Sequence, residues 1–399
     1  IKEGALAWNQ SFEKAGFKNA VQVKVQPDDA DWDAGDIRYN VLRWTSSPQP
    51  PFGGYGPAFT NPRTGQILGA DIMLENVFLT NRIQLADLLS SINGSEATQG
   101  IAGRTIRCSA GHNLQLSNIF GRQALKSMGL GGELEERMLD AGVRMLILHE
   151  IGHTLGLNHN MKASQIYTIE QLADADFVAA NGLTGSVMDY APVHLATPGR
   201  PQTGFYDVKP GPYDDWAIEF GYSPDLDGPD GEARRKALLD RSTEPLLTFG
   251  NDADDMRAPG SGIDPRVNVG DMSEDAINYA SERLDLVDEM LGDLRDKTGK
   301  EGESYQQLVN AYTGMSYEFA AAARTMSRYV GGVHVNRAMV GQPGAKTPFV
   351  PVALSDQKRA MAALRSKVFG PGAFAGSDEL YSHLRQQRRS FDFYGATED

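Results

Sequence analysis

The sequence has one cysteine, no excess of basic residues and no long apolar run. Its one cysteine, Cys108, excludes an internal disulfide and a cysteine-rich zinc site. Basic residues are outnumbered 38 to 52 by acidic ones and do not cluster, so we expect no nucleic-acid partner. No apolar run approaches the roughly 20 residues that cross a bilayer, so no membrane span is expected. Histidine is also scarce, and the placement of the seven present is therefore informative.

What is present is typical of a globular protein, with 41% hydrophobic and 23% charged residues among 399. At about 150 residues per domain, this length predicts two to three domains, or one large domain with an extension. The chain begins with Ile1 rather than methionine, which we interpret as a processed or trimmed product. The sequence makes no prediction about oligomeric state.

Apolar periodicity and turn residues predict the elements of the first part of the chain. The expected elements are a helix over 5–17, strands over 21–25 and 37–44, a loop over 47–65, a strand over 66–74 and a helix from 133 to about 156. Thr168 and Gln171 form a possible capping box that opens a short helix ending near Gly182.

The composition changes near Tyr222. Aspartate, glycine and proline are dense over 225–275, and helical periodicity returns over 284–294, 305–329 and 355–370. We therefore predict an α+β fold. A twisted mixed sheet and a long helix occupy residues 1–225, followed by an Asp/Gly/Pro-rich connection and a mostly helical region over residues 226–399.

A candidate metal site lies at the end of the helix expected from residue 133. The segment that starts at His149 reads HEIGHTLGLNH. His149 and His153 are four residues apart, so both rings project from one helical face and can bind the same ion. Gly156 can take the positive φ that turns the chain back and brings His159 round as a third ligand. Three histidines leave a fourth position open for water, which is typical of catalytic zinc, and Glu150 lies beside it as a general base.

Random placement would produce this pattern in roughly 1 of 100,000 chains of similar composition. An alternative interpretation is a group of buried, hydrogen-bonded histidines without a metal. It is disfavoured because several ring nitrogens would then need other partners.

With this motif the chain resembles the metzincin clan of zinc peptidases, whose other defining feature is a methionine turn beneath the metal. Ser-Val-Met-Asp-Tyr at 186–190 is similar to that turn, so the resemblance implies that Met188 lies under the zinc ion. Tyr190 matches a tyrosine that, in the astacin and serralysin branches, reaches the metal and stabilises the tetrahedral intermediate. A catalytic role for Tyr190 is therefore expected, beside the alternative of a core tyrosine.

The resemblance covers about residues 1–225. The first helix, around Trp8, is similar to the clan's opening helix, and residues 213–222 are similar to its closing helix. The strand over 66–74 stands where the clan has its substrate-binding edge strand. Asn160, after the third histidine, departs from the better-known branches. The whole chain looks most like a group of bacterial zinc-dependent metalloproteases with a helical extension, which implies an extracytoplasmic location.

These features predict a zinc-dependent endopeptidase with one catalytic Zn²⁺ and a protein or peptide substrate. The peptide is expected to lie extended along the edge strand. Two alternatives stay open: a zinc hydrolase of a non-protein amide such as a peptidoglycan cross-link, and an inactive peptide-binding module with the same fold. The presence of Glu150 argues against the inactive module, because a structural site has no use for a base there.

Other polar residues carry weaker signals. Two aspartate-rich stretches could present oxygen ligands to Ca²⁺, but neither forms a complete calcium loop, and we prefer solvated loops. The aspartates are Asp31, Asp33, Asp36, Asp225, Asp227, Asp230, Asp252, Asp254 and Asp255. The remaining histidines lack ligand spacing, so we expect surface or hydrogen-bonded rings, with His194 close enough to the methionine turn to line the cleft. They are His112, His194, His334 and His383. We expect Cys108 to be a small buried residue.

Overall fold

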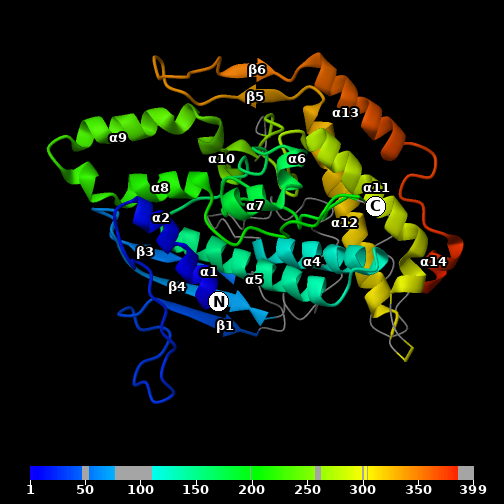
Figure 1. Ribbon diagram of the computed structural model, residues 1–399, viewed down its shortest axis with the longest axis horizontal. Helices are drawn as coiled ribbons and strands as arrows, with labels where there is room; N and C mark the ends of the chain where they lie inside the picture. The colour runs from blue at the N-terminus through cyan, green and yellow to red at the C-terminus, as the bar shows by residue number, and fades with distance from the viewer. Residues whose placement is uncertain are drawn as a thin grey trace.

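The computed structural model describes residues 1–46, 54–76, 110–197, 199–256, 262–298, 301–302 and 304–384. Cys108 and the side chains of His112 and Asp254 lie outside the described residues. The fold is α+β, as the sequence predicts, with a small mixed sheet and many helices. Figure 1 shows the sheet on one side of the molecule and the long C-terminal helices on the other.

The sheet is built around one long strand. Its strands are β1 (Val41–Thr45), β2 (Gly54–Tyr55), β3 (Ala58–Thr60) and β4 (Ile67–Glu75). Strand β4 confirms the strand expected over 66–74, but it is not a free edge. Leu74 pairs with Trp44 of β1 in parallel and with Gly54 of β2 in the antiparallel direction. The expected docking of a peptide on this strand is therefore wrong, because segments of the predicted 47–65 loop form β2 and β3 and pair with β4.

The predicted first helix is divided into α1 (Lys2–Ala7) and α2 (Asn9–Lys14). Trp8 joins them with near-helical angles of φ −60° and ψ −20°, so the interruption is slight. Its buried indole N–H donates to the carbonyl oxygen of Leu148 at 3.1 Å. This hydrogen bond fixes the N-terminal helices against the helix that carries the histidine motif.

Two predicted strands differ from the structure. Residues 21–25 form no strand, and the side chain of Val25 is 91% exposed, so the alternating valines do not mark a half-buried face. The strand expected over 37–44 begins only at Val41. The preceding residues form turns in which Tyr39 stacks on Trp32, with ring centroids 3.9 Å apart.

Two central helices connect the sheet to the rest of the molecule, and one of them packs on the sheet (Figure 1). Helix α5 (Glu133–Thr154) confirms the predicted long helix, with three acidic residues in its first turn, near the positive end of its dipole. Helix α4 (Ala110–Ser127) has no counterpart in the sequence prediction. It packs against α5 and against the C-terminal helices.

Short helices follow the motif. They are α6 (Ile169–Leu172), α7 (Ala175–Asn181) and α8 (Pro212–Tyr222). The predicted capping box is present: Gln171 N–H donates to Thr168 Oγ1 at 3.1 Å, and Thr168 N–H donates to Gln171 Oε1 at 2.9 Å. The single helix expected there is two helices, because Asp174 caps a second one. Helix α8 confirms the expected closing helix.

The remaining elements belong to the connection and the helical extension. They are η3 (Pro224–Asp227), α9 (Gly231–Asp240), η4 (Arg241–Thr243), η5 (Pro245–Leu247), α10 (Asp252–Asp255), α11 (Ala276–Lys297), α12 (Gln306–Tyr329), β5 (Val333–Val335), β6 (Phe349–Pro351), α13 (Leu354–Lys367) and α14 (Asp378–His383). The predicted helical periodicity is thus confirmed by α11, α12 and α13. The connection is more structured than predicted, since it contains α9.

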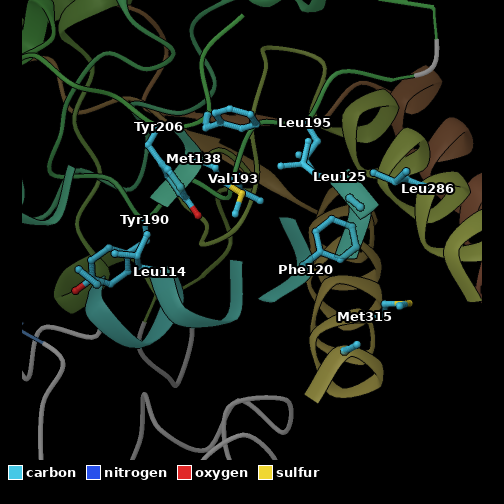
Figure 2. Packing of buried hydrophobic residues seen from close by; sticks show 14 of the residues in the cluster. Leu114, Phe120, Leu125, Met138, Tyr190, Val193, Leu195, Tyr206, Leu286 and Met315 are labelled. Atoms are coloured by element: carbon cyan, nitrogen blue, oxygen red, sulfur yellow. The ribbon is translucent and has the colours of Figure 1, made fainter. Parts of the chain in front are cut away.

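One hydrophobic cluster contains residues from both sides of residue 225. Figure 2 shows Phe120 of α4, Leu286 of α11 and Met315 of α12 among its members. The division at residue 225 stays a prediction, although the helical extension shares this core with α4 and α5. Among the described helices, none is long and apolar enough to cross a membrane.

Candidate metal centre

The end of α5 folds as the glycine in the motif requires. Gly156 has φ +91°, a conformation that side chains with a Cβ rarely adopt. The N–H of Leu157 donates to the carbonyl oxygen of Gly152 at 3.0 Å, and the N–H of Gly156 donates to that of His153 at 3.0 Å. These two bonds form a Schellman motif. The chain therefore reverses directly after the helix and returns His159 toward the two helical histidines.

The three motif histidines converge. A ligand atom from each of His149, His153 and His159 lies within 4.8 Å of the other two. The ring centroids of His149 and His153 are 4.8 Å apart, and those of His153 and His159 are 4.7 Å apart. The side chain of His149 is fully buried and that of His159 is 4% exposed. The three residues are thus arranged as a group that can hold one metal ion.

Backbone carbonyl oxygens fix the tautomer of the two helical histidines. Nδ1 of His149 lies 2.8 Å from the carbonyl oxygen of Val187, and Nδ1 of His153 lies 3.0 Å from that of Leu157. A carbonyl oxygen only accepts, so these Nδ1 atoms carry the proton and Nε2 keeps its lone pair. Within the described ranges, the buried Nε2 of His153 has no hydrogen-bond partner. A buried lone pair without a protein donor fits a metal ligand, and the imidazole set suits zinc.

Burial keeps the helical histidines uncharged. It lowers the pKa of His149 well below its usual range, and the neighbouring His153 and His159 lower it further. Burial, followed by the neighbouring His159, lowers the pKa of His153 to about 4. Both rings are therefore neutral near neutral pH, which is the state that coordinates a metal.

The turn over residues 186–190 is anchored by a buried carboxylate. Asp214 of α8 accepts hydrogen bonds from Ser186 Oγ at 2.5 Å, from the Val187 N–H at 2.9 Å and from the Gly211 N–H at 2.8 Å. Because the carbonyl of Val187 faces His149, Asp214 indirectly fixes the orientation of that ring. The sequence prediction missed Asp214. Its position in the first turn of a helix that begins at proline was the available signal.

Met188 lies directly against the motif helix. A Cβ atom placed on Gly152 would be 2.3 Å from Met188 Sδ and 3.2 Å from Trp8 Cζ2. Both neighbours are fully buried, and at 2.3 Å the Met188 side chain would have to shift within the core. The glycine between Glu150 and His153 is thus needed for the turn to approach the helix.

Replacement of Gly152 by alanine is expected to lower the free energy of unfolding by about 1 to 3 kcal/mol, because the added methyl group overpacks the contact with Met188. Alanine is ordinarily favoured over glycine in a helix by about 1 kcal/mol. Gly292→Ala is the matched control, since a Cβ there meets nothing within 4 Å. Urea unfolding of both variants measures the difference. A Gly152→Ala protein as stable as the Gly292→Ala protein would show that Met188 does not pack here.

Glu150 is buried beneath the backbone of β2 and the residues that follow it. Its side chain is fully buried, and a Cβ atom on Gly54 would lie 2.2 Å from Glu150 Oε1. A Cβ atom on Gly56 would lie 2.6 Å from the Glu150 backbone oxygen. Only residues without side chains allow β2 and the following turn to pass this close to the carboxylate. Strand β2 thus forms one wall of the site.

Tyr190 also belongs to the site. Its hydroxyl oxygen lies 2.9 Å from Nε2 of His159, and its side chain is 7% exposed. The ring centroids of Tyr190 and His159 are 4.7 Å apart. On its other edge, His159 places Nδ1 3.2 Å from Asp252 Oδ1. The sequence prediction had placed Asp252 among possible calcium ligands, and no local pattern connected it to the histidines.

The other histidines with described side chains lie apart from the centre. His334 is in β5, and the half-buried His383 places Nδ1 2.7 Å from the Glu379 carbonyl oxygen. His194 is buried, and lines a small cavity together with Tyr279 and Arg283. Of the aspartates, those with partners among described side chains include Asp36 with Arg38, Asp225 with Arg234, and Asp255 with Arg337. Calcium binding stays a prediction.

His194 is expected to make the protein less stable in acid. Burial, followed by the nearby Arg283, lowers its pKa from 6.5 to about 4. The unfolded chain therefore binds a proton at a pH where the native chain does not, and stability is lost as the pH falls from 6.5 to about 4. Relative to a His194→Gln variant, the native chain should lose up to about 3 kcal/mol across this window. Urea unfolding at several pH values measures this difference, and a constant difference would contradict the prediction.

Comparison with known proteins identifies a family for most of the chain. The Met-zincin family model matches residues 131–399, which is more than half of the chain and includes all three converging histidines. A search of curated proteins and a search of solved structures each found no match.

Proposed function

This chain belongs to the Met-zincin family, and on that premise we propose that it is a zinc-dependent endopeptidase. The observation that carries the proposal is the convergence of the His149, His153 and His159 ligand atoms within 4.8 Å. The helix that supplies two of these ligands also carries Glu150, a base that a purely structural metal site does not need.

His149, His153 and His159 would hold the zinc ion, which would supply Lewis-acid activation of a water and of the substrate carbonyl. Glu150 accepts the proton that the attacking water loses and later delivers it to the leaving amine. The burial of Glu150 under Gly54 and Gly56 keeps its carboxylate in a fixed place for both transfers.

Tyr190 supplies a hydrogen-bond donor. Its hydroxyl lies beside His159 Nε2, on the edge of the ring opposite Asp252. In the reaction this hydroxyl donates to the carbonyl oxygen as negative charge develops on it, the interaction by which oxyanion donors lower a barrier. The extracytoplasmic location stays a prediction.

Product analysis tests the proposal. The purified chain is incubated with unfolded casein and with a mixed peptide library, with and without a zinc chelator, and the products are identified by mass spectrometry. We expect cleavage at internal peptide bonds that stops with the chelator and returns with added zinc. No cleavage by the zinc-loaded protein would contradict the proposal. Cleavage confined to a cross-linked peptidoglycan fragment would instead favour the non-protein amide.

A further inference from the structure

We propose that Asp252 is a positioning residue of the metal site, which holds the His159 ring in the orientation and tautomer that metal binding requires. The proposal rests on the proposed function, because it concerns the same three histidines. Asp252 Oδ1 lies 3.2 Å from His159 Nδ1. The other ring nitrogen, Nε2, lies on the side of the Tyr190 hydroxyl. In this role the carboxylate favours the tautomer with its proton on Nδ1, so that His159 presents the lone pair of Nε2 to the site.

The three ligands differ in what holds them. Carbonyl oxygens of Val187 and Leu157 face Nδ1 of His149 and His153, whereas a carboxylate faces Nδ1 of His159. A carboxylate orients the ring more strongly than a neutral carbonyl and raises the basicity of the opposite nitrogen. His159 needs this support most, because it stands on the turn after the helix rather than on the helix itself.

The segment before Asp252 is fastened to the chain beside His159. Asn160 Nδ2 donates to the carbonyl oxygen of Thr248 at 3.0 Å, and Asn160 Oδ1 accepts from the Gly250 N–H at 3.1 Å. The Met161 N–H donates to the carbonyl oxygen of Gly250 at 2.7 Å. These bonds place residues 248–250 alongside residues 160–161. Asp252 then begins α10 within reach of the ring.

Close packing and side-chain bonds around this segment support the same placement. A Cβ atom on Gly250 would lie 2.4 Å from Val267 Cγ2, so the approach requires glycine. Asn251 Nδ2 donates to the carbonyl oxygen of His159 at 3.4 Å, and the Asn251 N–H donates to Asp255 Oδ2 at 2.8 Å. The connection therefore completes the metal site from a part of the sequence that follows the predicted catalytic domain. Asn160, the unusual residue after the third histidine, makes two of the hydrogen bonds that hold this segment beside His159.

Zinc affinity tests this inference in the full chain. Asp252→Ala removes the carboxylate, Asp252→Asn removes its charge, and Asp227→Asn, at an exposed position of the same connection, is the matched control. Competition with a chromophoric chelator should show a roughly 10- to 100-fold larger dissociation constant for zinc in Asp252→Ala. We expect a smaller loss of zinc affinity in Asp252→Asn and none in the control. Urea unfolding of the metal-free proteins should be unchanged, because a positioning role acts on the metal and not on the fold.

The visible absorption of bound Co²⁺ gives a second readout. Because Asp252 fixes the third ligand, its removal should change the ligand-field spectrum, and Asp252→Glu should restore part of the native spectrum and affinity. If the native chain binds zinc and the Asp252→Ala chain binds it equally tightly, the inference is wrong while the proposed function stands. A native chain that binds no zinc would overturn both.

Discussion

Replacement of Glu150 by glutamine is expected to lower the rate of peptide hydrolysis by on the order of 10²- to 10⁴-fold, the contribution typical of a general base. Glutamine has nearly the same shape, so it fits the buried place beneath Gly54 and Gly56. It cannot accept the proton of the attacking water. The zinc content should remain unchanged, because the three histidines are untouched.

The kinetic constants kcat and KM, determined on a peptide that contains a casein cleavage site, measure this effect. The loss should appear in kcat, because proton transfer occurs in the chemical step. Glu136→Gln, at an exposed position on the same helix, is the matched control and should retain native activity. A Glu150→Gln protein with native kcat would remove Glu150 from its proposed role.

Replacement of His153 by alanine is expected to abolish both zinc binding and hydrolysis. Removal of a residue that only hydrogen-bonds to a metal ligand typically weakens metal affinity roughly 10- to 100-fold. Removal of a direct ligand should weaken it more. His153 is the most informative ligand to remove, since its buried Nε2 has no protein partner within the described ranges. The metal-free protein should therefore lose little stability.

Metal analysis of the purified variant, together with chelator competition, measures this prediction. His383→Ala, at a half-buried position in α14, is the control and should keep native zinc affinity. Native zinc affinity in the His153→Ala protein would show that the metal is held elsewhere. Equal loss in both variants would indicate a general effect of histidine removal.

The fold was predictable where one face of an element is polar and the other apolar. The predicted helix from residue 133 and the strand over 66–74 both follow this rule and correspond to α5 and β4. Helix α4 was missed because it is surrounded by protein, and buried polar residues such as Gln115, Ser117 and Asn118 interrupt its apolar pattern. Pairing partners were equally unpredictable: short strands from the expected loop occupy an edge of β4 that had been assigned to the substrate.

The local part of the candidate site was predictable for a similar reason. Helix geometry places His149 and His153 on one face, and a glycine turn returns His159, so a short motif is enough to predict their convergence. The carboxylates that support the site could not be predicted from the sequence. Asp214 and Asp252 reach the site from distant segments through tertiary contacts. The sequence around Asp214 indicates a helix start but not its partner, and the sequence around Asp252 gives no sign of its contact.

The stepwise return of zinc to the metal-free protein, with peptide hydrolysis measured at each ratio, tests the central claim most directly. We predict that hydrolysis rises in proportion to the added zinc and stops rising near one ion per chain, because the described residues bring together one set of three converging histidines. Full hydrolysis by the metal-free protein, or no hydrolysis of any peptide in a mixed library at any zinc ratio, would contradict this account.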